Sequence, residues 1–137
     1  MLKLTGMNIL LVDDTPDNLY VMESVLEEQG YNIFQAASGP EALFMLTQRD
    51  FDLVLLDVQM PEMDGFEVAQ LMKGNSKTKD VAIIFITALS KEIRHIQKGY
   101  DVGAENYLFK PIEPDELRKK VEVSLKYRRF KKIGEQR

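Results

Sequence analysis

The stretch NILLVDDTPDN, residues 8–18, gives the first indication of the fold. Five residues that suit a buried β-strand lead directly into two adjacent carboxylates, Asp13 and Asp14. Similar apolar runs occur at 53–56 (LVLL) and 81–87 (VAIIFIT), and such runs are typical of parallel strands that are covered on both faces. Two acids at the end of a strand of this kind repel each other, and buried carboxylates have to be paired, protonated or bound to a cation.

The rest of the chain alternates between β-like and helical patterns. Two more β-like runs lie at 32–36 and 106–110, and helical patterns cover 15–30, 38–46, 65–72, 90–100 and 113–130. The first helix has Pro16 near its start and Gly30 as its stop, and the second begins with a capping box, Ser38 and Glu41. This alternation predicts an α/β fold, with a parallel sheet between two layers of helices and a crevice at the carboxyl ends of the strands.

Composition limits the class of protein. The 137 residues fit one domain, 45% of them are hydrophobic, and there is no cysteine, which excludes a disulfide framework and a thiolate metal site. No targeting segment or membrane-spanning run is apparent, and we expect a cytoplasmic protein. The net charge of −4 is unevenly distributed, because residues 126–137 carry six Lys or Arg against one Glu.

A third acid repeats the pattern of the opening stretch. In DLVLLDVQMPEMDG, residues 52–65, an apolar strand again ends in a carboxylate, Asp57. If the first and third strands are neighbours in a parallel sheet, Asp57 lies beside Asp13 and Asp14. Three carboxylates this close need a divalent cation, and a site made only of oxygen ligands favours Mg²⁺ or Mn²⁺.

The last two strands end in groups that can bind a phosphoryl group. The fourth strand ends at Thr87, and the fifth at Lys110, which Pro111 follows. A cation, a hydroxyl and an ammonium around one carboxylate can bind and stabilise a phosphoryl group on it. The competing interpretation is that the acids are ordinary solvated loop residues.

In these features the sequence resembles the receiver domain of two-component response regulators. The matching segments are VDD (12–14), LLDVQMPEMDG (55–65), ITA (86–88) and GAENYLFKP (103–111), in this order and spacing. The resemblance covers about residues 7–124, which leaves 125–137 as a basic helical extension or linker. It implies a flavodoxin-like, doubly wound sheet of five parallel strands in the order 2-1-3-4-5, with helices on both faces.

The resemblance also implies a role for each site residue. Asp57 would be the nucleophile and phosphoacceptor. Asp14, Asp57 and the backbone carbonyl of Gln59 would bind Mg²⁺ directly, and Asp13 would act through a metal-bound water. Thr87 and Lys110 would bind phosphoryl oxygens, with a cis peptide between Lys110 and Pro111. Tyr107 would turn inward on activation and signal through the surface of the fourth helix, fifth strand and last helix; the alternative is that it is simply a core residue.

The phosphoryl group has to come from a partner. The only histidine, His95, has no acidic or amide neighbour at the spacing of a phosphodonor site, and no glycine-rich nucleotide loop is present. We therefore expect a sensor histidine kinase or a phosphotransfer protein as the donor. The chain would be a signalling domain that catalyses only its own phosphorylation and dephosphorylation, not an enzyme acting on other substrates.

Three other functions compete with this prediction. A phosphatase of the haloacid dehalogenase type also forms an aspartyl phosphate, but it needs a second Asp where this chain has Gln59. A flavin-binding module would need a phosphate-binding loop after the first strand, and DDTPDN is acidic. A DNA-binding regulator would act through the basic tail, although the body is acidic and there is no recognition motif.

Two local features remain open. The MPEMDG loop, 60–65, is predicted to be a turn in which Gly65 permits a backbone conformation that other residues resist. The tail continues the last helix with Tyr127, Phe130 and Ile133 at spacings of three among basic residues. Three interpretations of the tail compete. It is a signalling helix that leads to an output domain missing from this chain or to a dimer partner, or it is a solvated basic end. A nucleic-acid contact is the third interpretation and ranks last.

Overall fold

The computed structural model describes residues 3–88 and 93–135, with the side chains of these residues except 93–95 and 135. The strands are β1 (Asn8–Val12), β2 (Asn32–Ala36), β3 (Leu53–Asp57), β4 (Ala82–Thr87) and β5 (Asn106–Phe109). The helices are α1 (Pro16–Leu26), η1 (Glu27–Gln29, a 3-10 helix), α2 (Gly39–Gln48), α3 (Gly65–Lys73), α4 (Ile93–Asp101) and α5 (Pro114–Glu135). The predicted start of the fourth helix, residues 90–92, lies outside the described residues.

The five strands form one parallel sheet in the order β2-β1-β3-β4-β5. This confirms the predicted fold class and strand order. Val12 of β1 pairs with Leu56 of β3. The residues that follow them, Asp13 and Asp57, therefore reach the carboxyl edge of the sheet at the same level. The register of the sheet therefore brings together two acids that are 44 residues apart in the sequence.

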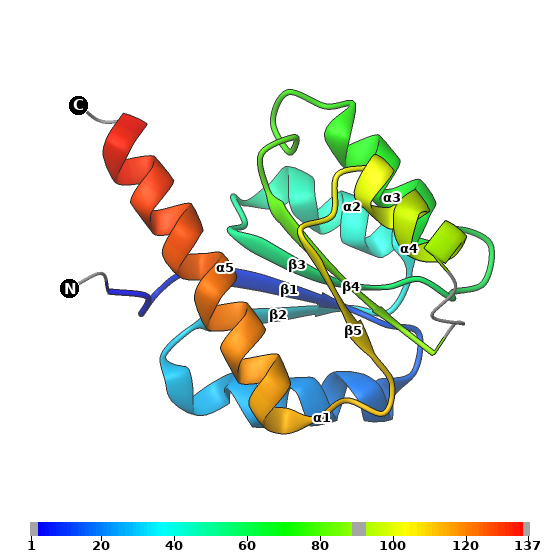
Figure 1. Cartoon of the computed structure of the whole chain (residues 1–137), viewed down its shortest axis with the longest axis horizontal. Coiled ribbons are helices and arrows are strands. Elements are labelled where there is room, and N and C mark those ends of the chain that lie inside the picture. Colours follow the sequence, from blue (N-terminus) through cyan, green and yellow to red (C-terminus); the bar gives the residue numbers. More distant parts are fainter. Residues whose placement is uncertain (1–2, 89–92, 136–137) are drawn as a thin grey trace.

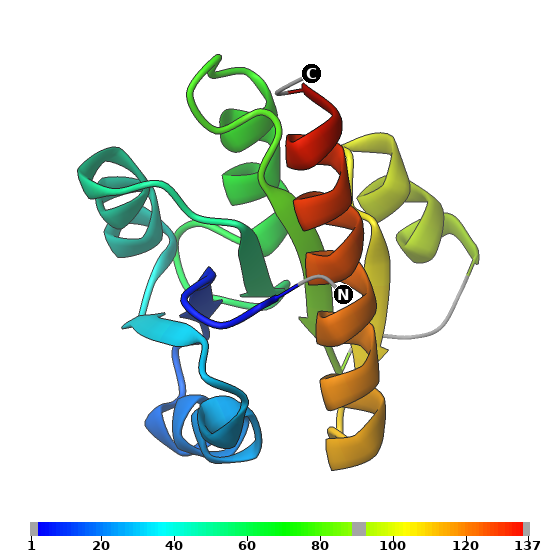
Figure 2. The same ribbon diagram turned by 90° about the vertical axis from the view of Figure 1, so that its left-hand side faces the viewer.

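Helices cover both faces of the sheet (Figures 1 and 2). Helices α1 and α5 lie on one face, and α2, α3 and α4 lie on the other. Strands β3 and β4 are buried along their whole length, as their apolar sequences predicted, whereas the edge strand β2 is only partly buried. Each face has its own apolar core, and the stripe of Leu117, Val121 and Leu125 in α5 packs under the sheet as expected.

Local sequence signals set the helix ends. Pro16 occupies the first turn of α1, and Gly30, with a φ of 78°, ends η1 in the left-handed conformation that glycine adopts at little cost. The Ser38 hydroxyl accepts a hydrogen bond from the Glu41 backbone N–H, as expected of an N-cap. The complete capping box, however, is formed at α3 by Asp64 and Glu67.

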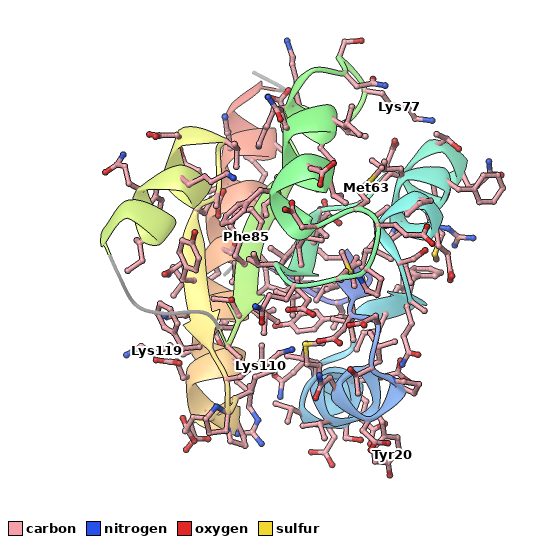
Figure 3. The ribbon with its side chains drawn as sticks, turned by 90° about the vertical axis from the view of Figure 1, so that its right-hand side faces the viewer. Tyr20, Met63, Lys77, Phe85, Lys110 and Lys119 are labelled. Atoms are coloured by element: carbon pink, nitrogen blue, oxygen red, sulfur yellow. The ribbon has the colours of Figure 1, made fainter. Side chains whose placement is uncertain are left out.

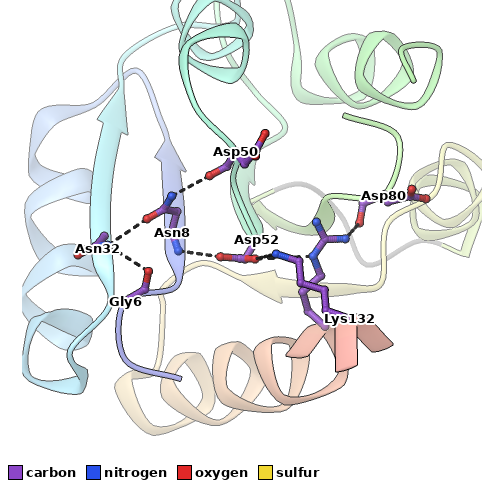
Figure 4. Close-up of polar contacts among 8 residues, drawn as sticks. Gly6, Asn8, Asn32, Asp50, Asp52, Asp80 and Lys132 are labelled. Atoms are coloured by element: carbon purple, nitrogen blue, oxygen red, sulfur yellow. Dashed lines mark hydrogen bonds and ion pairs between the residues drawn. The ribbon is translucent and has the colours of Figure 1, made fainter. Parts of the chain in front are cut away.

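The described part of the basic extension, up to residue 135, is the continuous end of α5, and it is attached to the sheet (Figure 4). The Lys132 ammonium lies 2.8 Å from a carboxylate oxygen of Asp52, whose other oxygen accepts the Asn8 backbone N–H at 2.9 Å. Arg128 donates to the backbone carbonyl of Asp80. These contacts argue against a solvated basic end, although Phe130 on the same helix is exposed.

Earlier along α5, two further contacts bind the helix to β5 and the loop before it. Lys120 donates to the backbone carbonyl of Tyr107, and Ser124 donates to Glu105, each at 2.7 Å.

No helix in the described part of the chain is long and apolar enough to cross a membrane.

Candidate functional site

The two acids that follow β1 have different surroundings. Asp13 is fully buried, and Asp14 is exposed. The Asp13 carboxylate accepts the Thr15 backbone N–H at 2.9 Å and the Lys110 ammonium at 3.1 Å. The side-chain amide of Asn18 donates to both of its oxygens, at 3.3 and 3.2 Å. The negative charge of Asp13 is thus compensated within the protein, whereas Asp14 faces solvent.

Asp57 is a buried carboxylate with weaker support. Its side chain is 3% exposed, and its Oδ1 lies 3.4 Å from both the Lys110 ammonium and the Gln59 backbone nitrogen. Burial, and to a lesser degree the nearby charge of Asp13, raise the pKa of Asp57 to about 6, although Lys110 partly opposes both. Of the two buried acids in this group, Asp57 is therefore the one with the longer contacts to protein donors.

The three carboxylates meet as predicted. Asp13, Asp14 and Asp57 each offer an oxygen, and these oxygens lie within 4.8 Å of one another. Three negative charges face one ammonium, so the excess charge suits a cation, and an all-oxygen donor set suits a hard divalent ion. The cluster can bind a metal ion.

Lys110 lies at the carboxyl edge of the sheet, between β5 and α1 (Figure 3). Burial alone would lower its pKa, but the hydrogen bond to Asp13 and the charges of Asp57 and Asp13 outweigh burial and raise the pKa above its usual value. The ammonium therefore stays charged between two acids. The peptide bond from Lys110 to Pro111 is cis, as the resemblance implied.

Thr87 ends β4 beside this group. It is buried, pairs with Phe109 across the sheet, and its backbone carbonyl accepts the Lys110 N–H at 2.9 Å. Gln59 follows Asp57 on the loop after β3, and its side chain is exposed. The structure thus places these two residues around the acids.

Tyr107 lies away from the acids, in the core on the α3 and α4 side of the sheet. It is 5% exposed, and its ring centroid lies 5.5 Å from that of Phe85 and 5.6 Å from that of Tyr100. Gly99 of α4 makes room for it, since a Cβ there would lie 2.6 Å from the Tyr107 Cζ. The buried position agrees with a core residue and with an inward switch residue alike.

The predicted reason for Gly65 is wrong. The residue of this loop with a positive φ is Glu62, at 68°, whereas Gly65 is not among the glycines with positive φ. Glycine is needed at 65 for space, because a Cβ would lie within 3.0 Å of the Asp57 carbonyl carbon and the Val58 Cα. The Gly65 N–H also donates to the Val58 carbonyl at 2.9 Å. The start of α3 therefore packs directly on the backbone of Asp57.

Sequence reasoning missed Asn18. Its position in the first turn of the helix that follows the acid pair was the available signal, because the start of that helix faces the same sheet edge. Asn18 also lines a cavity of about 250 Å³ with Val21, Lys110, Pro111 and Ile112.

Sequence comparison relates most of this chain to known proteins. Residues 9–122 match the response regulator receiver domain family. The chain is 42% identical over 133 residues to a probable cyclic di-GMP phosphodiesterase of Vibrio cholerae, covering 97% of this chain and 30% of that protein. It is 35% identical over 118 residues to the DNA-binding dual master transcriptional regulator RpaA of Synechocystis, covering 86% of this chain and 48% of that protein.

The fold agrees as well. The solved structure of the chemotaxis response regulator CheY4 of Vibrio cholerae matches with a TM-score of 0.82 and 32% identity, over 88% of this chain and 99% of that one. The chain belongs to the response regulator receiver domain family, and its role is that of a receiver domain in two-component signalling. This leaves the haloacid dehalogenase alternative without support. The chain spans less than half the length of the two curated relatives described above.

Proposed function

We propose that Asp57 is the phosphoacceptor of this receiver domain and takes its phosphoryl group from the phosphohistidine of a partner histidine kinase or phosphotransfer protein. The observation that carries this proposal is the convergence of Asp57 with Asp13, Asp14 and Lys110 at one sheet edge. Receiver domains act with histidine kinases, so the class of donor follows from the family. The domain accordingly acts in the cytoplasm, as a signalling protein.

The transfer is a substitution at phosphorus. A carboxylate oxygen of Asp57 forms the new O–P bond as the P–N bond of the phosphohistidine breaks, and the imidazole leaves with the electron pair and takes up a proton. With a pKa of about 6, Asp57 is mostly ionised near pH 7 and has the lone pair that the attack requires. The contacts of the Asp57 carboxylate with Lys110 and with the Gln59 N–H are long, at 3.4 Å, which leaves a carboxylate oxygen available to attack phosphorus.

The other residues of the cluster prepare the acceptor. Asp14, Asp57 and the Gln59 carbonyl would hold Mg²⁺, or Mn²⁺ in its place, with Asp13 acting through a bound water. When bound, the ion supplies positive charge against the three acids and the phosphoryl oxygens. Asp14 suits direct ligation because it is exposed, whereas the hydrogen bonds to Asp13 suit an outer position.

Lys110 and Thr87 would bind the transferred group. The Lys110 ammonium already lies within 3.4 Å of Asp57 and can move to a phosphoryl oxygen. The Thr87 hydroxyl would donate to another oxygen. Because Phe85 and Thr87 of β4 pair with Tyr107 and Phe109 of β5, a shift of Thr87 would act on the packing of Tyr107 and on the α4-β5-α5 surface.

We further propose that the receiver unit spans residues 7–124 and that 125–137 connect it to an output domain, with dimerisation through this end as the alternative. The similarity to the Vibrio cholerae phosphodiesterase includes most of the extension, since it covers 97% of the chain. Cyclic di-GMP hydrolysis by an attached domain is therefore the output we favour. Assays of the complete gene product for that activity would test it.

Labelling tests the acceptor. A small acyl phosphate with Mg²⁺ should label the parent chain, and hydroxylamine should remove the label, as expected of an acyl phosphate. Asp57→Ala should abolish labelling, and Asp17→Ala, which removes an exposed acid in the first turn of α1, should leave it unchanged. Hydroxylamine-sensitive label in Asp57→Ala would refute the assignment.

A further inference from the structure

Asp13 is a fully buried carboxylate, and the donor that contacts both of its oxygens is Asn18. The Asn18 amide lies 3.3 Å from Oδ1 and 3.2 Å from Oδ2, the Thr15 N–H serves Oδ1, and Lys110 serves Oδ2. A buried anion needs such donors, and removing one leaves its desolvation cost uncompensated. Asn18 thus supplies much of the support for the Asp13 carboxylate.

The position of Asn18 is fixed by the helix that carries it. Pro16 starts α1, and the next residue after Asn18, Leu19, is buried in the core under the sheet. The Asn18 side chain does not cap the helix, and in the described part of the chain its amide donates only to Asp13. The contact therefore serves the acid.

Asp13 and Asp57 share one cation. The Lys110 ammonium lies 3.1 Å from Asp13 and 3.4 Å from Asp57. Because Asn18 and Thr15 already donate hydrogen bonds to the Asp13 carboxylate, Asp13 does not depend on the Lys110 ammonium alone for compensation of its charge. Without Asn18, the charge of Asp13 would draw Lys110 more strongly and would be less neutralised toward the rest of the cluster.

We propose that Asn18 is a positioning residue that holds the Asp13 carboxylate in place, compensates its charge, and so keeps Lys110 available to Asp57. This rests on the proposed phosphoacceptor function. Two consequences follow for Asn18→Ala. The metal-free protein should become less stable, and it should bind Mg²⁺ more tightly, because the cluster then presents more uncompensated negative charge.

The test measures the Mg²⁺ dissociation constant by calorimetry in the parent, Asn18→Ala, Asp13→Ala and the double variant, with urea unfolding in chelator for each. We expect Asn18→Ala to lower the dissociation constant at least threefold in the parent background and to change it little in the Asp13→Ala background. Such non-additivity shows that Asn18 acts through Asp13. A purely structural role would lower stability without changing Mg²⁺ affinity.

Asn32→Ala is the matched control, since its amide donates to Gly6 and Asn8 at the opposite edge of the sheet. It should leave Mg²⁺ affinity unchanged. An unchanged or weaker affinity in Asn18→Ala, or an equal change in both backgrounds, overturns the proposal. Failure of the parent to bind Mg²⁺ or to be labelled at Asp57 would instead refute the phosphoacceptor function itself.

Discussion

The substitution Asp52→Ala should lower the free energy of unfolding much more than Asp50→Ala, at an exposed neighbouring acid, or Lys132→Ala, at the ion-pair partner of Asp52. The Asp52 side chain is 10% exposed and lies at the amino edge of the sheet, away from the candidate site. It accepts the Asn8 N–H at 2.9 Å and lies 2.8 Å from the Lys132 ammonium. The Arg128 Nε also lies 3.8 Å from the Asp52 carboxylate. Removing Asp52 therefore leaves a strand N–H without this partner and leaves Lys132 and Arg128 of α5 without their counter-charge.

The magnitude follows from these contacts. An unpaired, partly buried N–H costs about 1–3 kcal/mol, and the ion pair to Lys132 is worth no more than about 1 kcal/mol because that lysine side chain is 42% exposed. We therefore expect a loss of about 2–3 kcal/mol for Asp52→Ala, which lowers Tm by roughly 6–15 °C in a domain of this size. Lys132→Ala should cost about 1 kcal/mol or less, and Asp50→Ala about 0.5 kcal/mol or less.

Urea unfolding followed by circular dichroism measures these values. The reasoning predicts an order, with Asp52 far ahead of Lys132 and Lys132 ahead of Asp50. If Asp52→Ala unfolds at the same urea concentration as Asp50→Ala, neither the Asn8 hydrogen bond nor the ion pair to Lys132 stabilises the fold in solution. If Lys132→Ala costs as much as Asp52→Ala, the assignment of most of the energy to the Asn8 hydrogen bond is wrong.

Three further predictions concern the candidate site. Between pH 3.8 and about 6 the folded chain keeps a proton on Asp57 that the unfolded chain has released, so metal-free stability should fall as pH rises through this window. Asp57→Asn should remove that dependence and stabilise the metal-free protein near pH 7 by about 3 kcal/mol in urea titrations, and an unchanged pH profile would contradict the raised pKa. Gly65→Ala should lose about 1–3 kcal/mol and most of the acyl phosphate labelling, because its Cβ displaces the Asp57 backbone; normal labelling would count against this. Gly99→Ala should expel the Tyr107 ring, detected as greater tyrosine quenching by iodide, whereas no change would show that α4 moves instead.

Much of the fold was predictable because the strands carry their own signal. Strands β3 and β4 are buried on both faces, so nearly every residue in them is apolar, and their positions can be predicted from the sequence. The acids, hydroxyl and ammonium that end the strands stood out against these runs, and parallel pairing necessarily gathers strand ends at one edge. The predicted grouping of Asp13, Asp14 and Asp57 was correct for that reason.

The features that could not be predicted from the sequence are contacts between residues that lie far apart in the chain and meet only in the folded structure. Gly65 was assigned a backbone role, but its need arises from the approach of the Asp57 carbonyl, which only the packed structure brings near. Asn18 is a polar residue in the first turn of a helix, and its sequence neighbours do not indicate that it binds Asp13. The contacts of Asp52 are also absent from the local sequence, because its partners Asn8 and Lys132 lie 44 residues before it and 80 residues after it.

The attachment of α5 has a consequence for anything joined beyond it. A flexible linker of a dozen residues would let a following domain range over ~20 Å, since its mean end-to-end distance grows as the square root of its length. Here Lys120, Ser124 and Lys132 fix α5 to the rest of the domain at three points along its length. The starting point and direction of a following segment are therefore set by the domain, and its effective concentration at a nearby target depends on geometry rather than on random search.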